Sequence, residues 1–225
     1  MLGLSLTTAN ADELSEQAAI ARGGQLYDKW FKVVGVDKPK ETHAAYPSAG
    51  KQKGNATWRC KECHGWDYMG AAGAYAKGSH FSGIKGVNGM AGADPGAIIG
   101  VLKDKNHGLG DVGMEARDLM NVALFVSKGQ VDYDQYIDRA TKAPKGDKAK
   151  GKVYFETICV GCHGLDGKQP KDMGKTLGAQ MGNPWEVMHK ILNGQPAEKM
   201  PALRAIDWQV SVDIMAHLTT LPKEK

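Results

Sequence analysis

Every cysteine of the chain falls in one of two short motifs, and each motif ends in a histidine. They are Cys60-Lys-Glu-Cys63-His64 and Cys159-Val-Gly-Cys162-His163. Two thiols that lie one helical turn apart can bond covalently to the two vinyl groups of one porphyrin, and the adjoining imidazole then ligates the iron. The motifs therefore predict two haem c groups, with His64 and His163 as the proximal iron ligands.

Two other chemistries use paired cysteines, and neither accounts for these histidines. A redox-active C-x-x-C pair follows a strand in a β-α-β pattern and needs no histidine after it. A structural zinc site that uses all four cysteines leaves His64 and His163 unexplained. Because the two motifs together use every cysteine, covalent haem attachment is the favoured interpretation.

The composition is that of a soluble globular protein. At 225 residues the chain is long enough for about one and a half domains of ordinary size. Apolar residues make up 42% and charged residues 24%, which argues against disorder. The net charge is only +4 without a long basic tract, so nucleic-acid binding has little support. No apolar run approaches the roughly 18 residues of a membrane helix, so we expect no membrane span in the mature chain.

The sequence around the two motifs forms an internal repeat of helical segments. Residues 151–154 lie just upstream of the second motif, and the similar segment 24–27 lies farther upstream of the first. Both segments predict a helix that precedes haem attachment. In the first half, an insertion over 33–58 that is rich in Gly, Pro and Lys separates this helix from Cys60.

The helices downstream of the motifs also correspond. Asp94-Pro95 and Asn183-Pro184 each supply an N-cap residue followed by proline at the first helical position, and Glu186 makes Asn183 a capping-box candidate. The last helices are predicted over 115–128 and 207–221, each with apolar residues along one face. Each half is therefore predicted to be mostly helical, with one helix before the haem attachment site, one in the middle of the half and one at its end.

On these motifs and helices, the chain resembles a tandem of class I cytochrome c domains, as in dihaem cytochromes of the c4 type. The resemblance covers nearly all of the chain beyond residue 15. It implies an all-α fold in which the first and last helices of each domain cross, and it implies electron transfer. The expected first domain is 12–130, the linker 131–150 and the second domain 151–225. The insertion at 33–58 departs from the compact family pattern and predicts an added substructure.

In this family the sixth iron ligand lies on a loop shortly before the last helix. In the second half that loop contains Met200-Pro201. Thioether sulfur suits haem iron and raises its reduction potential, and Pro201 favours an extended conformation at Met200. We therefore expect Met200 to ligate the second iron. The rival methionines are Met173 and Met181, for which surface or core-filling roles are the simpler interpretation.

The first half lacks an equivalent Met-Pro pair. Superposing the last helices with Met114 on Asp207 places His107 on Met200, and His107 lies in a loop of the right kind. A neutral imidazole is a good iron ligand, so we expect bis-histidine ligation of the first iron by His64 and His107. The competing side chains are Met114, Met90 and His80. Because bis-histidine ligation lowers the potential relative to His/Met ligation, we expect the first haem to donate electrons to the second.

The remaining features concern surroundings and compartment. For His43, His189 and His217 we expect packing or solvated roles. The lysine-rich segment 142–152 predicts a solvated linker, or alternatively a docking surface for an acidic redox partner. Residues 1–11 end in an A-x-A cleavage pattern and are interpreted as the remnant of a signal peptide.

The resemblance implies a periplasmic site, because this bacterial family attaches its haem outside the cytoplasm. The predicted function is a periplasmic carrier that shuttles electrons between redox partner proteins. The alternative is a haem enzyme, either a dihaem peroxidase or a small-anion oxidoreductase. That alternative requires an open or displaceable sixth position on the first iron, which the iron would have if His107 were not a ligand.

Overall fold

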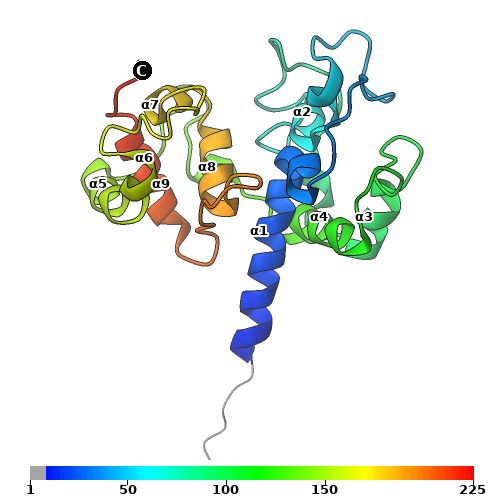
Figure 1. Ribbon diagram of the computed structural model, residues 1–225, viewed down its shortest axis with the longest axis horizontal. Coiled ribbons are helices and arrows are strands. Elements are labelled where there is room, and N and C mark those ends of the chain that lie inside the picture. Colours follow the sequence, from blue (N-terminus) through cyan, green and yellow to red (C-terminus); the bar gives the residue numbers. More distant parts are fainter. Residues whose placement is uncertain (1–8) are drawn as a thin grey trace, which may run out of the picture.

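The structure is a computed structural model that describes residues 9–225, with side chains from residue 15 onward, and this part of the chain is helical without β-strands. Figure 1 shows two lobes, α2–α4 in one and α5–α9 in the other, with α1 running between them and extending beyond both. The helices are α1 Ala9–Val34, α2 Cys60–His64, α3 Pro95–Leu102, α4 Ala116–Lys128, α5 Lys148–Tyr154, α6 Val160–His163, α7 Leu177–Gln180, α8 Pro184–Asn193 and α9 Trp208–Leu218. Shorter turns are η1 Gly54–Trp58, η2 Asn88–Met90, η3 Tyr133–Gln135 and η4 Phe155–Cys159.

The predicted all-α character and the last helix of each half are confirmed. α4 and α9 occupy the ranges predicted at 115–128 and 207–221, although α9 ends three residues early, at Leu218. None of the helices in the described part of the chain has the length and apolar character needed to cross a membrane. The predicted signal-peptide remnant lies mainly in residues 1–8, outside the described residues.

In the first lobe, the first and last helices cross at a glycine. α1 packs against α4, and a Cβ atom at Gly23 would lie 2.0 Å from the carbonyl oxygen of Asn121. Only a residue without a side chain permits this approach. One turn farther along α1, Tyr27 is buried against Phe125 of α4, with ring centroids 5.3 Å apart. The Tyr27 hydroxyl then donates a hydrogen bond of 2.7 Å to the carbonyl of Gly65, directly after the first motif.

The second lobe repeats this crossing. α5 packs against α9, and a Cβ atom at Gly151 would lie 1.8 Å from the carbonyl oxygen of Asp213. Phe155, four residues after the glycine, is buried with 1% of its surface exposed. In both lobes a glycine therefore brings two helices into contact, and a buried aromatic ring follows it by one turn.

The two crossings correct the alignment of the halves by one residue. Gly23 is the counterpart of Gly151, because each meets the carbonyl oxygen of the last helix of its own lobe. The same contacts make Asn121 the counterpart of Asp213. The superposition derived from the sequence pairs Asn121 with Ile214 instead and is wrong by one position. Helix periodicity alone does not fix a register, whereas a close backbone contact does.

Both middle helices start where the sequence predicts, at Pro95 after Asp94 and at Pro184 after Asn183, but their caps differ. At α3 the Asp94 carboxylate accepts a hydrogen bond of 2.9 Å from the backbone N–H of Ala97, and Pro95 occupies the first turn, as predicted. At α8 the Asn183 side chain caps no backbone group, so the predicted capping box is wrong. Its amide instead donates to the Glu186 carboxylate over 3.1 Å.

The insertion at 33–58 has little regular structure but is anchored to α1. The Trp30 indole of α1 donates a hydrogen bond of 2.8 Å to the carbonyl of Trp58. The Trp58 indole in turn donates a hydrogen bond of 2.9 Å to the carbonyl of Glu41, which joins the end of the insertion to its first part. The insertion therefore ends at a fixed position immediately before the first motif.

The segment predicted as a linker, 131–150, has two parts of different character. In the first part, Tyr133 and Ile137 are each only 1% exposed, and an isolated β-bridge joins Ile137 to Pro144. In the second part, the lysine side chains are exposed to solvent. Only the second part is therefore solvated in the way the composition predicts.

The two lobes meet around His189 of α8, which is completely buried. Its ring lies beside the rings of Trp66 and Phe125, with centroids 5.0 and 5.5 Å away. Its Nε2–H donates to the carbonyl of Gly24 over 2.9 Å, so its Nδ1 accepts from the Tyr68 hydroxyl, 3.1 Å away. The packing role predicted for His189 is confirmed, and the residue joins α8 to the first lobe.

Charged groups reinforce this contact between the lobes. Asp28 of α1 binds Arg59 of the first lobe, and its other oxygen accepts from Lys190 of α8 over 3.0 Å. Although burial raises the pKa of Asp28, the Lys190 and Arg59 charges hold it well below its usual range. The buried Arg204 of the second lobe donates to the carbonyl of Gly129 over 2.9 Å. The lobes are thus joined by satisfied polar groups as well as by apolar packing.

Candidate haem sites

The first motif forms a helix of its own, α2, which ends at Gly65 in a left-handed conformation with φ 81°. This single turn places the Cys60 and Cys63 thiols on neighbouring positions of one helix surface. Burial raises the pKa of both thiols to about 12. A raised thiol pKa does not favour a redox-active dithiol, whose chemistry depends on a thiolate.

The imidazole of His64 is oriented by the backbone. Its Nδ1 lies 2.8 Å from the carbonyl oxygen of Lys85. Because a carbonyl only accepts hydrogen bonds, Nδ1 carries the proton and Nε2 is left as the unprotonated nitrogen. Burial also lowers the pKa of His64 and so favours the neutral ring. A neutral imidazole with its outer nitrogen fixed by a carbonyl is ready to bind a metal.

The ring of His107 faces that of His64. The two ring centroids are 6.3 Å apart, and the ring planes differ by 21°. Two imidazoles that share one metal, with metal–nitrogen bonds of about 2 Å and ring radii of about 1.1 Å, have centroids about 6.2 Å apart. The observed spacing therefore fits two imidazoles that bind one iron from opposite sides.

The competing side chains in the first half have other surroundings. Met114 is 5% exposed and belongs to the hydrophobic core. Met90 lies in η2 and is half-buried against that core. His80 donates a hydrogen bond of 2.6 Å to the Glu62 carboxylate and packs on the ring of Tyr75. Of the side chains considered as sixth ligand, His107 is the one whose ring lies close to the ring of His64, with the centroids 6.3 Å apart.

The second motif follows a helix that changes its winding just before the cysteines. α5 continues into η4, a π-helical turn that ends at Cys159, and then into α6. Such turns are rare and are often found at functional sites. α6 ends at Gly164 with φ 68°, as α2 ends at Gly65. Burial raises the pKa of the Cys159 thiol to about 11.

His163 is oriented in the same way as His64. Its Nδ1 lies 3.0 Å from the carbonyl oxygen of Gln169, so its Nε2 is also the unprotonated nitrogen. The two motifs thus share three features: a short helix through the cysteines, a left-handed glycine after the histidine, and a carbonyl acceptor for Nδ1. The sequence showed the motif in each half, but it gave no indication of the two carbonyl partners.

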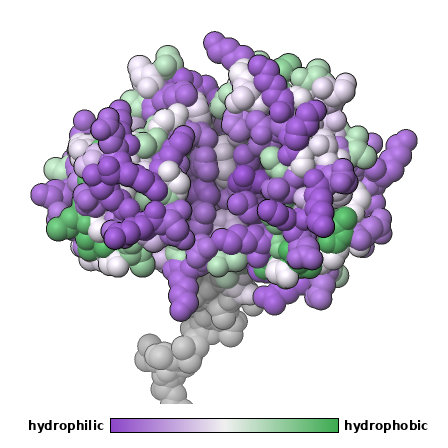
Figure 2. Space-filling view, turned by 45° about the horizontal axis from the view of Figure 1, so that its top comes forward, coloured by the Kyte–Doolittle hydropathy of each residue, from purple (hydrophilic) through white to green (hydrophobic). Residues whose placement is uncertain are grey.

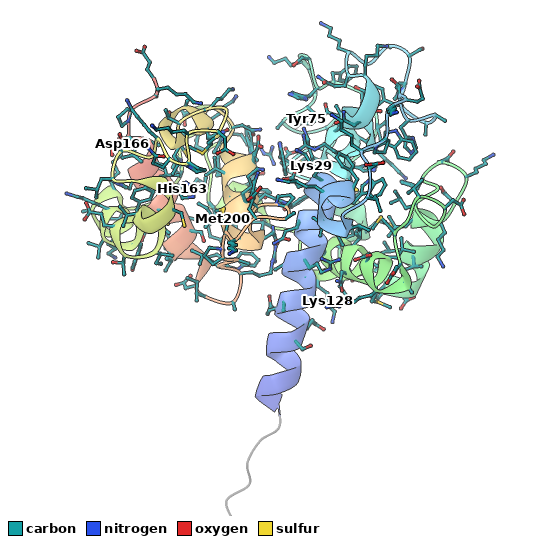
Figure 3. All side chains as sticks on the ribbon, in the orientation of Figure 1. Lys29, Tyr75, Lys128, His163, Asp166 and Met200 are labelled. Atoms are coloured by element: carbon teal, nitrogen blue, oxygen red, sulfur yellow. The ribbon has the colours of Figure 1, made fainter. Side chains whose placement is uncertain are left out.

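Met200 lies on the loop between α8 and α9, half-buried against the core. A backbone hydrogen bond of 3.0 Å from Leu203 to Ile191 holds this loop to α8. Figure 3 shows Met200 beside α8 and His163 on α6, both in the second lobe. Of the two rivals, Met181 is 8% exposed and ends α7, and Met173 lies in the preceding turn.

The structure does not bring the four cysteines together into the zinc site that was considered as an alternative. No disulfide joins any two of the four cysteines, all of which lie within the described residues. Across the described residues, no three side chains of His, Cys, Asp or Glu come together as a metal ion would require. The two cysteine pairs are therefore separate features of the two lobes.

The fold and the second motif define the second lobe as a c-type cytochrome domain. A family model described as "Cytochrome C oxidase, cbb3-type, subunit III" matches residues 146–216, a stretch that contains α5 to α8 and most of α9. Neither the curated proteins nor the solved structures contain a match to this chain. The protein therefore carries a covalent haem c, and electron transfer with redox partner proteins is the activity of such a domain.

Proposed function

We propose that the protein is a dihaem electron carrier with one haem c in each lobe and both faces of each iron ligated by the chain. The repeated helix crossing and the carbonyl-bound proximal histidines support a tandem of two cytochrome c domains. The proposed attachment and axial residues are Cys60, Cys63, His64 and His107 in the first lobe, and Cys159, Cys162, His163 and Met200 in the second. Each haem supplies one reversible one-electron couple at its iron.

The pairing of His64 with His107 is the single observation that carries this proposal. The spacing of 6.3 Å between the two rings supports a six-coordinate first iron. An iron with protein ligands on both faces transfers electrons and has no free position for a substrate. This favours a carrier over the alternative of a peroxidase or small-anion oxidoreductase.

The two ligand sets also imply a direction of electron flow. A thioether ligand raises the potential of a haem iron relative to a second imidazole. The first lobe, with His107, then has the lower potential, and the second lobe, with Met200, has the higher. Electron transfer from the first lobe to the second is favourable on this assignment.

The surface is suited to transient contact with a partner protein. Figure 2 shows hydrophilic side chains over most of both lobes on the face that it displays, with apolar groups confined to small patches. A run of exposed lysines precedes and opens α5: Lys142, Lys145, Lys148, Lys150 and Lys152. We propose that these lysines steer an acidic redox partner toward the second lobe, and that the encounter takes place in the periplasm.

The proposal is tested on the matured full-length protein. Mass spectrometry should give the mass of the polypeptide plus two haems, and magnetic circular dichroism should resolve one His/His and one His/Met low-spin centre. His107→Ala should convert only the first centre to high spin, whereas His43→Ala should leave both centres low-spin. A mass without two haems contradicts the dihaem assignment. A high-spin spectrum of the native oxidised protein, or carbon monoxide binding to the native reduced protein without denaturant, contradicts the carrier and favours the haem enzyme.

A further inference from the structure

The loop that carries His107 is organised by one carboxylate, that of Asp104. Its Oδ1 accepts hydrogen bonds from the backbone N–H groups of Asn106 and His107, over 2.8 and 2.9 Å. The Asp104 carbonyl also accepts from Gly108, over 2.8 Å. These contacts close a tight turn immediately after α3. The turn fixes the backbone of His107, whose ring centroid lies 6.3 Å from that of His64.

The same oxygen also binds the imidazole of His107. His107 Nδ1 lies 3.0 Å from Asp104 Oδ1, and a carboxylate only accepts, so Nδ1 carries the proton. Nε2 is then the nitrogen left free for a metal. One side chain thus sets both the backbone position and the protonated nitrogen of His107.

This acceptor distinguishes His107 from the two proximal histidines. His64 and His163 each donate to a neutral backbone carbonyl. His107 donates to a charged carboxylate, and hydrogen bonds to charged groups are roughly twice as strong as neutral ones. A stronger acceptor at Nδ1 shifts electron density toward Nε2 and makes the imidazole a stronger donor to a metal.

Resting on the proposed bis-histidine ligation, we propose that Asp104 is a positioning residue that orients His107 and strengthens its bond to the first iron. A stronger imidazole donor stabilises the oxidised iron and so lowers the potential of the first lobe below what two carbonyl-bound histidines would give. Asp104 is thereby a source of the potential difference between the lobes, in addition to the exchange of methionine for histidine.

The test is a graded series at this position in the holoprotein, followed by spectroelectrochemistry and near-infrared magnetic circular dichroism. Asp104→Asn keeps an acceptor oxygen but removes its charge, and Asp104→Ala removes the acceptor. Asp138→Asn is the matched control, because Asp138 makes the same kind of turn with the backbone N–H of Thr141, 2.7 Å away, and binds no histidine. All three variants make the same change in net charge.

We expect the potential of the first centre to rise from Asp to Asn to Ala, while the second centre and the Asp138→Asn protein keep their wild-type potentials. Loss of the hydrogen-bond acceptor of a ligating histidine typically changes the metal affinity by about tenfold or more. If the affinity of the imidazole for oxidised iron falls tenfold relative to its affinity for reduced iron, the potential rises by about 59 mV. The charge-transfer band of the first centre should shift in the same order. If Asp104 had only a structural role, the position of this band would not follow the series from Asp to Asn to Ala.

Two results would overturn the inference, and they are distinguishable. If His107→Ala makes the first centre high-spin but the Asp104 series leaves its potential and band unchanged, His107 is a ligand and Asp104 does not tune it. If His107→Ala leaves the first centre unchanged, the ligand assignment itself fails and Asp104 loses its role with it. If Asp104→Ala misfolds, the Asn variant alone decides, since it retains the turn contacts.

Discussion

The buried His189 at the contact between the lobes predicts a specific dependence of stability on pH. Burial lowers the pKa of His189 to about 4 in the folded protein, whereas an exposed histidine titrates near 6.5. The folded pKa is depressed, so between these values the unfolded chain binds a proton that the folded chain does not. Stability therefore falls as the pH drops from about 6.5 toward 4.

The magnitude follows from the two pKa values. The two pKa values of His189 differ by about 2.5 units. When the pH falls from above 6.5 to below 4, this difference lowers the free energy of unfolding by about 3 kcal/mol. Between pH 7 and pH 5 the loss is about 2 kcal/mol, because most of the unfolded chain is already protonated at pH 5.

The assay is urea unfolding of the holoprotein at pH 7 and pH 5, with free imidazole added so that histidines of the unfolded chain do not bind the irons. Wild type is compared with His189→Gln, in which the amide can still donate to the Gly24 carbonyl and accept from Tyr68 but does not titrate. The variant is expected to be less stable at pH 7. Its further loss at pH 5 should be about 2 kcal/mol smaller than that of wild type.

The comparison of the two proteins isolates His189 from the other titrating groups. Asp28, Lys190 and Arg204 all act on the His189 ring, but they are present in both proteins. If wild type and His189→Gln lose the same free energy of unfolding between pH 7 and pH 5, His189 is not held neutral by burial, and the interpretation of the contact between the lobes is refuted.

Three further predictions concern the second lobe. Met200→Ala should abolish the spectroscopic signature of sulfur ligation and lower the potential of the second centre, whereas Met173→Ala should change neither. Magnetic circular dichroism and potentiometry measure these two properties. The opposite pattern would make Met173 the ligand. Gly151→Ala should destabilise the protein by about 1–3 kcal/mol in urea unfolding, because the new methyl group meets the Asp213 carbonyl. Gly100→Ala, a helical glycine with open space around it, should not be destabilising. Replacing Lys148, Lys150 and Lys152 with Glu should slow reduction or oxidation by an acidic partner in stopped-flow experiments and weaken its dependence on salt; unchanged rates at low salt would exclude this surface.

The sequence predicted the parts of the haem sites that are encoded locally. The two C-x-x-C-H motifs specify a short helix with a histidine at its end, and that is how α2 and α6 are built. The cap at Asp94 was predictable for the same reason, because it depends on contacts within one turn. Local chemistry of this kind is visible in a single sequence without knowledge of the fold.

The remainder depends on contacts between distant segments. His189 reaches Gly24 and Tyr68, which are 165 and 121 positions away, and nothing in its neighbourhood distinguishes it from an ordinary helix residue. The register of the last helices was wrong by one position, because apolar periodicity tolerates such a shift and the contact at Gly151 does not. The prediction of His107 rested on that register, yet the facing rings of His64 and His107 support it independently.

The proximal and distal sides of the two sites are therefore controlled differently. On the proximal side each histidine uses a carbonyl of its own lobe, 21 residues downstream for His64 and 6 for His163, so each lobe can form this half of its site by itself. On the distal side of the second lobe, the loop of Met200 depends on α1: Gln25 donates to the carbonyl of Asn193 over 2.8 Å, and Lys32 binds Glu198 over 2.6 Å. Because α1 also packs in the core of the first lobe, we expect a disturbance of the contact between the lobes to reach Met200, the proposed sixth ligand, before it reaches His163. The proposed sixth ligand of the second iron, Met200, thus lies on a loop that α1 contacts directly.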